Sequence, residues 1–271
     1  MKKKILALGV CVSMLAVAVV GGTMAYFTDT EQATNTMATG SIKIKLNEQK
    51  RGTDKMEEFK SSDITFMPMV YHADAASANK VEDSIAQTSV FSERFENVVD
   101  KFVSVTNTGA DEAYVRVLFA FEGDCGVVED YIGYNINDDA SCDFSFVHEG
   151  YDPEGKLINA RGIMDGDGTT WSIAEAVYPV EIAKGETTPY SLKQLFLAPS
   201  ATAEGIKAHF GTNLAYDIKV VAQATQEAGF DTAREALNTS FGNVQAAFGD
   251  EDFVTDATLL EWFGLPKVVT P

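Results

Sequence analysis

Apolar and polar positions alternate with a period of two along much of the chain, which is the pattern of strands that bury one face. Three stripes of apolar residues show it most clearly: Ile42, Ile44 and Leu46; Val115, Val117, Phe119 and Phe121; and Tyr216, Ile218, Val220, Ala222 and Ala224. Each stripe predicts a strand whose apolar face packs against a core.

Turn signals separate the predicted strands. Each of two turns lies between a pair of strands: the first at 107–111, between strands at 102–105 and 115–121, and the second at Lys184–Gly185, between strands at 178–182 and 191–197. The Asn and Gly of the first turn suit a hairpin connection. Many short strands with turns between them predict an antiparallel β-sandwich.

Helix signals concentrate near the C-terminus. Thr232 and Glu235 have the spacing of a capping box, which predicts the start of a helix. Residues 255–263 have helical character, and Gly264 and Pro266 follow them as a normal helix end. The last part of the chain is therefore expected to be helical.

These signals divide the chain into three parts. Residues 26–225 are predicted to form a mainly β, jelly-roll-like antiparallel sandwich domain, and 226–271 a small helical appendage. Residues 47–95 mix charged residues and serines with scattered methionines and aromatics in no steady period, so we interpret them as a long, partly helical insertion. The first 25 residues form the third part.

These first 25 residues have the features of a secretory signal peptide. Three lysines at 2–4 precede an apolar run of 16 residues at 5–20, and small residues fit a cut between Ala25 and Tyr26. A retained anchor helix is the alternative, but a bilayer span needs about 20 apolar residues. We expect cleavage, and a mature protein that works outside the cytoplasm.

Charge excludes several classes of partner. The chain has 40 acidic and 21 basic residues, and loss of residues 1–25 removes three lysines, which takes the net charge from −19 to −22. Such a surface repels phosphate backbones and anionic lipids. We therefore expect no nucleic-acid partner, and contact with a membrane only through the uncleaved signal.

The mature chain has two cysteines, Cys125 and Cys142. In an exported protein they predict a disulfide, which would stabilise the fold by roughly 3 kcal/mol. Two separate thiols are the alternative. Their spacing is unlike that of a metal or redox motif.

Candidate catalytic chemistry is sparse. His72, His148 and His209 each stand alone, with no HExxH pair, and neither a GxSxG nor a phosphate-binding glycine motif occurs. The acidic stretches at 138–139 and 165–168 favour turns and offer only a weak possibility of calcium binding. The sequence therefore predicts neither catalytic residues nor a cofactor.

Four regions carry a family resemblance: GGTMAYFTDTE at 21–31 with ATNT at 33–36 and ATGSI at 38–42; NVVDKFVSVTNTG at 97–109; AYVRV at 113–117; and YDIKVVAQA at 216–224 with AGFDTA at 228–233. They resemble the export signal, the mature N-terminus and the strand patterns of the TasA/camelysin family. These are secreted proteins of Gram-positive bacteria that a SipW-type signal peptidase processes. Residues 47–95 and 122–175 show no such resemblance.

The resemblance implies a jelly-roll sandwich, and a structural rather than enzymatic role as a subunit of biofilm matrix fibres in the extracellular matrix or at the cell surface. In this family a subunit can lend its N-terminal segment as a strand to the next copy. Residues 26–41 are poor in core residues, and Tyr26, Phe27 and Met37 are the expected anchors of such a donor strand. A floppy terminus, or a strand paired with the edge of its own domain, is the alternative.

Two other functions stay open. A monomeric cell-surface adhesin or carbohydrate-binding sandwich would share the fold. Camelysin relatives also carry a metalloprotease label, and this function would need a non-standard site built from dispersed histidines and carboxylates.

The first prediction concerns export. Because small side chains fit the −3 and −1 pockets of the peptidase, N-terminal sequencing of the secreted protein should begin Tyr-Phe-Thr-Asp. Recovery of a species that keeps Met1 from the culture medium would contradict cleavage after Ala25.

Overall fold

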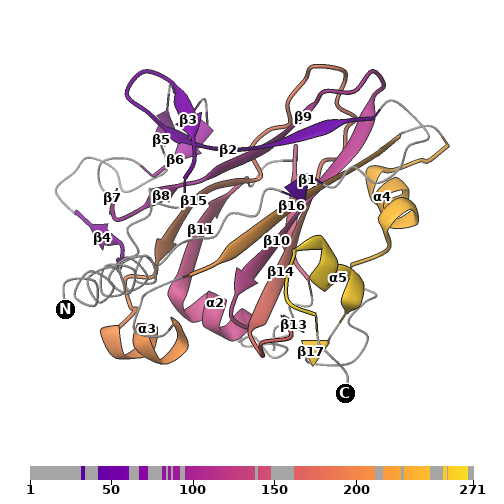
Figure 1. Ribbon diagram of the computed structural model, residues 1–271. Coiled ribbons are helices and arrows are strands. Elements are labelled where there is room, and N and C mark those ends of the chain that lie inside the picture. Colours follow the sequence, from indigo (N-terminus) through magenta and orange to yellow (C-terminus); the bar gives the residue numbers. More distant parts are fainter. Residues whose placement is uncertain are drawn as a thin grey trace, which may run out of the picture.

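Two β-layers lie face to face across the main hydrophobic core, and helices cover the outer side of one layer (Figure 1). This computed structural model describes residues 32–33, 42–60, 67–72, 81–83, 85–86, 88–91, 95–137, 140–147, 162–210, 216–226, 229–244, 253–254 and 256–267. Most strand pairs within them are antiparallel, and helices are few. The predicted mainly β fold class is confirmed, and the jelly-roll connectivity stays an expectation of the resemblance.

The first layer is a seven-stranded sheet. Six of its strands follow one another in the order β1 (Gln32–Ala33), β16 (Ile218–Gln226), β10 (Ala113–Glu122), β14 (Thr170–Val177), β13 (Gly162–Met164) and β17 (Phe253–Val254). The seventh strand, β12 (Asp143–Phe146), pairs with β14 beside β13. Pairing is parallel only at the two ends of this order, between β1 and β16 and between β13 and β17.

The second layer consists of two three-stranded sheets. One has the order β3 (Met56–Glu58), β2 (Ile44–Arg51) and β9 (Phe102–Asn107), and the other has the order β11 (Ile132–Ile136), β15 (Leu192–Leu197) and β8 (Val99–Asp100). Backbone hydrogen bonds from Ser191 N to Val103 O (2.9 Å) and from Lys101 N to Lys193 O (3.0 Å) join the two sheets.

Smaller elements lie around these layers. Two short strand pairs, β4 (Val70–Tyr71) with β7 (Phe95–Glu96) and β5 (Val81–Asp83) with β6 (Thr88–Val90), flank the second layer. The four described helices are α2 (Cys125–Tyr131), α3 (Ala203–Phe210), α4 (Ala233–Phe241) and α5 (Ala257–Trp262).

The predicted apolar stripes build the core between the layers. The stripe of β10 and most of the stripe of β16 face Leu46 of β2, together with Val103 and Val105 of β9. The period-two alternation therefore identified the inner faces of both layers correctly.

The first layer is also buried on its outer face. Leu118, Ala120 and Val221 pack there against α5 and the turn that follows it, while Tyr114 and Val177 pack against α4. Every residue of β10 but the last is consequently buried. For this reason β10 has few of the polar residues that a strand with one solvent-exposed face would carry.

Both predicted C-terminal helices are present. Thr232 caps α4, with its side-chain oxygen accepting from Glu235 N–H (3.2 Å), as the capping-box spacing predicts. Asp256 caps α5 by accepting from the N–H groups of Thr258 and Leu259. After α5, Gly264 takes the left-handed conformation that ends a helix.

The hairpin predicted around residues 107–111 is wrong. Strand β9 pairs with β2, whereas β10 pairs with β14 and β16, so the two strands lie in different layers. Asn107 explains why: its Oδ1 accepts from Gly109 N–H (2.9 Å), and its Nδ2 donates to the carbonyl oxygens of Asp111 and Ile182 (2.8 Å each). The turn therefore carries the chain from one layer to the other.

The strand pair predicted on either side of Lys184–Gly185 is wrong for the same reason. The turn is present, with Gly185 at a φ of +82°. However, residues 178–182 form only an isolated bridge at Ile182, and β15 pairs with β11 and β8. This connection also crosses between the layers.

The helical character predicted for residues 47–95 does not appear in the described part of that segment, which forms strands instead. Strand β2 runs on to Arg51 and folds back onto β3. Phe59 and Val90 are buried, which anchors two parts of the segment to the fold. Because several short pieces pair separately, the sequence shows no single period.

A second prediction tests the cap of α4. Thr232→Ala removes the acceptor for Glu235 N–H and should cost about 1 kcal/mol of unfolding free energy. Thr239, exposed within the same helix, gives the matched control, because Thr239→Ala loses no cap. Denaturant unfolding should separate the two variants, and equal midpoints would contradict the role of the cap.

Candidate functional site

The outer edge of the seven-stranded sheet is the candidate site for assembly. Strand β1 pairs in parallel with β16, with Gln32 opposite Val221 and Ala33 opposite Ala222. On its other side β16 pairs with β10 over its whole length of nine residues. Strand β1 is two residues long, so within the described residues most of this edge has no strand partner.

Strand β16 is held firmly behind this edge because both of its faces are packed. Ile218, Val220 and Ala222 lie in the main core, and Val221 packs beneath α5 on the other face. Strand β1 also contacts β2, so the edge lies where the two layers approach each other (Figure 1). A rigid strand whose edge lacks a strand partner among the described residues is a template for backbone hydrogen bonds from another segment.

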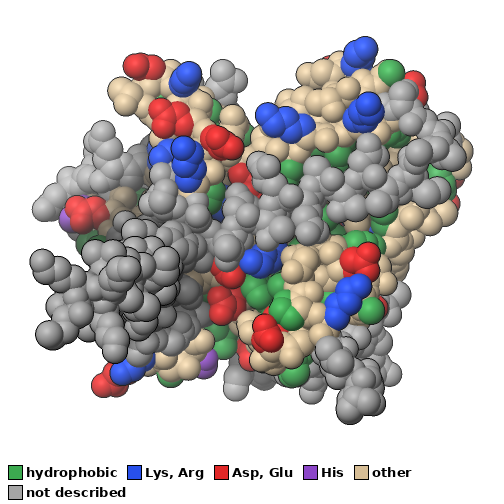
Figure 2. Space-filling view, viewed as in Figure 1, with side chains coloured by type: hydrophobic (Ala, Val, Ile, Leu, Met, Phe, Trp, Pro, Cys, Tyr) green, Lys and Arg blue, Asp and Glu red, His purple; other side chains and the backbone are tan. Residues whose placement is uncertain are grey.

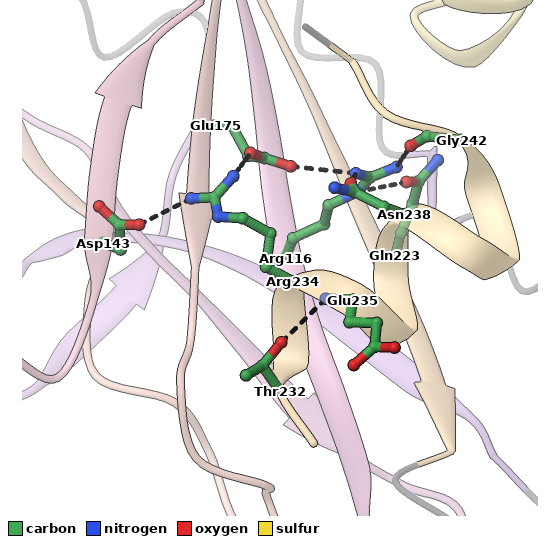
Figure 3. Close-up of polar contacts among 9 residues, drawn as sticks. All are labelled: Arg116, Asp143, Glu175, Gln223, Thr232, Arg234, Glu235, Asn238 and Gly242. Atoms are coloured by element: carbon green, nitrogen blue, oxygen red, sulfur yellow. Dashed lines mark hydrogen bonds and ion pairs between the residues drawn. The ribbon is translucent and has the colours of Figure 1, made fainter. Parts of the chain in front are cut away.

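A cluster of polar side chains with a buried centre and an exposed rim, here called the Arg116 network, joins the outer face of the sheet to α4 (Figure 3). It consists of Arg116, Asp143, Glu175, Gln223, Arg234, Asn238 and the carbonyl group of Gly242. Arg116 is fully buried and donates to Gln223 Oε1 (2.8 Å), Glu175 Oε1 (3.0 Å), Asn238 Oδ1 (3.2 Å) and Gly242 O (3.2 Å). Four acceptors from three elements and a turn thus surround one guanidinium group.

Glu175 shares its carboxylate between two arginines. While Oε1 accepts from Arg116, Oε2 accepts from Arg234 Nη1 (2.5 Å), and Arg234 Nη2 reaches Asp143 (2.6 Å). Burial lowers the pKa of Arg116, and the charge and hydrogen bond of Glu175 oppose this shift. The network is therefore a structural clamp, which fixes α4 against β10, β14 and β16.

In the acidic turn at 165–168, the carboxylate of Asp165 is held by internal hydrogen bonds. The Oδ1 of Asp165 accepts from the N–H groups of Asp167 (2.9 Å) and Thr169 (3.0 Å), and its Oδ2 accepts from Trp171 Nε1 (2.9 Å). Such an arrangement favours the turn over a calcium site. Residues 138–139 lie outside the described part of the chain.

The described histidines lie in separate places. His72 forms an exposed ion pair with Glu96 (2.9 Å), and the ring of His209 on α3 lies 5.1 Å from that of Tyr131. His148 is outside the described residues. Across the described part of the chain, no group of three His, Cys, Asp or Glu side chains is placed to hold a metal ion.

The Cys125–Cys142 disulfide stays a prediction, although segments next to the two cysteines pair at opposite ends of β14. Next to Cys142, Asp143 pairs with Val177 at one end of β14, whereas Glu122, just before Cys125, pairs with Trp171 at the other end. The thiol of Cys142 is buried, while the side chain of Cys125 lies outside the description.

The other predicted site residues lie outside the described part of the chain. These are the cleavage pair Ala25 and Tyr26 and the strand-donor anchors Tyr26, Phe27 and Met37. Among the described helices, none is both long and apolar enough to span a membrane. On the face seen in Figure 2, acidic and basic side chains are interspersed.

Sequence reasoning missed the Arg116 network. Its one local signal is a charged residue inside an apolar strand, at Arg116 among valines and at Glu175 between alanines. A buried charge needs partners, so these two residues could have been predicted to meet. Their helical partners Arg234 and Asn238 could not.

A third prediction tests the clamp. Glu175→Gln leaves Arg116 buried without its counter-charge and should lower the unfolding free energy by about 3–5 kcal/mol. Glu112 is exposed, so Glu112→Gln is the matched control and should change stability by less than about 0.5 kcal/mol. A denaturation midpoint for Glu175→Gln equal to that of the control would show that the clamp is not needed.

Comparison with known proteins finds a family match for the N-terminal region of the chain. Residues 1–65 match the sequence model of a family described as camelysin metallo-endopeptidase. No curated protein and no solved structure matches the chain significantly. The matched residues include β1 and β2 and contain no histidine. The match confirms the resemblance to the TasA/camelysin family at residues 21–42 and extends it to residue 65.

Proposed function

We propose that this protein is a secreted structural subunit of extracellular biofilm matrix fibres, and that its copies assemble by N-terminal strand donation. A SipW-type signal peptidase would release the donor segment by cutting between Ala25 and Tyr26. The pairing of β1 with β16 carries the proposal. It puts two residues of the donor segment on the sheet edge that a neighbouring copy would use.

The pairing within one chain is short enough to be exchanged. Each backbone hydrogen bond contributes only about 0.5–1.5 kcal/mol, and β1 offers two residues to a strand of nine. The same segment from a neighbouring copy can pair along more of β16 without any change in chemistry. Exchange of one element between identical chains is a low-cost route to assembly.

The donor segment needs side chains that set its register. Residues 26–41 consist mostly of small and polar residues, which specify register weakly. Tyr26, Phe27 and Met37 are its larger apolar residues and are the proposed anchors. Packing of these side chains against the acceptor subunit would fix one register of the donated strand.

The proposal treats the protein as a structural subunit and not as an enzyme. The separate positions of His72 and His209, and the internal hydrogen bonds of Asp165, support this view. The family description names a metallo-endopeptidase, which makes proteolysis the second candidate function. Casein cleavage by the purified mature protein that EDTA abolishes would favour this candidate.

A fourth prediction tests strand donation. Deleting residues 26–39 from the mature protein should leave a folded monomer that forms no filaments, because the donor is gone while the acceptor edge remains. Far-UV circular dichroism would report the fold, and negative-stain microscopy the filaments. Filaments as abundant as those of the full mature chain would contradict strand donation.

Two controls sharpen this test. Replacing residues 26–39 by a Gly/Ser segment of equal length keeps the chain length but removes the anchors, so this variant should also stay monomeric. A synthetic peptide of residues 26–41, added in excess to the mature protein, should occupy acceptor edges and shorten the filaments. A scrambled peptide of the same composition should have no such effect.

A further inference from the structure

We propose that a groove on the outer face of β2 and β9 binds an uncharged oligosaccharide. The groove has a volume of about 790 Å³, which is within the range of small-molecule sites. Its lining includes Asn47, Gln49, Ser104, Thr106, Thr187 and Tyr190. None of these residues belongs to β1 or β16, so the groove is separate from the assembly edge.

Strand register creates the polar floor. Asn47 of β2 lies directly opposite Ser104 of β9. Their neighbours Leu46 and Val105 point into the main core, so the alternation turns Asn47 and Ser104 to the other face. The strand pattern explains why polar residues point to this face. It does not explain why they line a groove, because residues of other segments form part of the lining.

The absence of charge from the groove points to a neutral ligand. None of the twelve described lining residues is Asp, Glu, Lys, Arg or His, although the chain carries 61 acidic and basic residues with a net charge of −19. An anionic ligand would meet a repelling protein field with no arginine or lysine to bind it. A cationic ligand would find no carboxylate in the lining.

The groove combines preorganised and available hydrogen-bonding groups. Asn47 Nδ2 donates to Thr106 Oγ1 (2.8 Å), and the hydroxyls of Thr106 and Thr187 lie 2.7 Å apart, which fixes these side chains. The half-buried amide of Gln49 has no hydrogen-bond partner among the described residues. Amides and hydroxyls can both donate and accept, as sugar hydroxyls do.

Tyr190 supplies the apolar surface that a sugar ring also needs. Its half-buried ring packs against Phe102, with the ring centroids 5.0 Å apart. Burial raises the pKa of the Tyr190 hydroxyl, which keeps it protonated as a donor. A fixed aromatic ring with a polar tip is suited to a ligand whose surface alternates C–H groups and hydroxyls.

A fifth prediction tests the groove on the full mature protein. In affinity gel electrophoresis, neutral glucan, mannan and galactan serve as probes, and alginate as the anionic comparison. At least one neutral polysaccharide should retard the protein, and Tyr190→Ala should weaken that binding about tenfold, as expected when an aromatic anchor is truncated. Tyr71 is exposed and outside the groove, so Tyr71→Ala is the matched control and should bind normally.

Gln49→Ala gives a second variant that leaves the packing on Phe102 intact. It should also weaken binding, while thermal unfolding of both variants monitors their fold. Because neither residue lies at the β16 edge, both variants should still form filaments if the mature chain does, so this test is independent of assembly. No retardation by any neutral probe, binding of alginate alone, or retardation unchanged in both variants would overturn the proposal.

Discussion

Burial of the seven-stranded sheet on both faces is the constraint on which the other features depend. One face meets the second β-layer, and the other is covered by α4 and α5. On the outer face, a cluster of Gln223, Arg116 and Glu175 on adjacent strands interrupts this apolar packing. Because a buried guanidinium needs acceptors, the docking of α4 completes with Asn238 the set that Gln223 and Glu175 of the sheet begin. The clamp thus links the position of α4 to β16, the strand of the proposed assembly edge.

The two proposals use different faces of the molecule and different chemistry. The proposed strand exchange at β16 depends on the backbone and on an edge that has few strand partners among the described residues. The groove on β2 and β9 depends on side-chain amides, hydroxyls and one aromatic ring. A polymer of such subunits would repeat the groove along its length, so that weak binding by each copy adds up through multivalency.

Local patterns predicted what depends on local sequence. The apolar stripes predicted which faces of the strands point into the core, and the spacing of Thr232 and Glu235 predicted where α4 begins. The hairpin failed because Asn107 has its decisive partner at Ile182, 75 residues away, and nothing in a turn motif reports such a contact. Of the candidate site, the N-terminal segment was predicted, whereas the Arg116 network and the groove required the fold, since each draws its side chains from segments far apart in the sequence.

The parallel pairing of β1 with β16 also has a directional consequence. A donated strand that keeps this polarity enters every acceptor edge in the same sense, so each contact is head-to-tail and joins two different surfaces of the chain. A row built in this way has two unlike ends: one presents an unused donor segment, and the other an unfilled edge. Such a fibre is polar, and its two ends need not grow at the same rate.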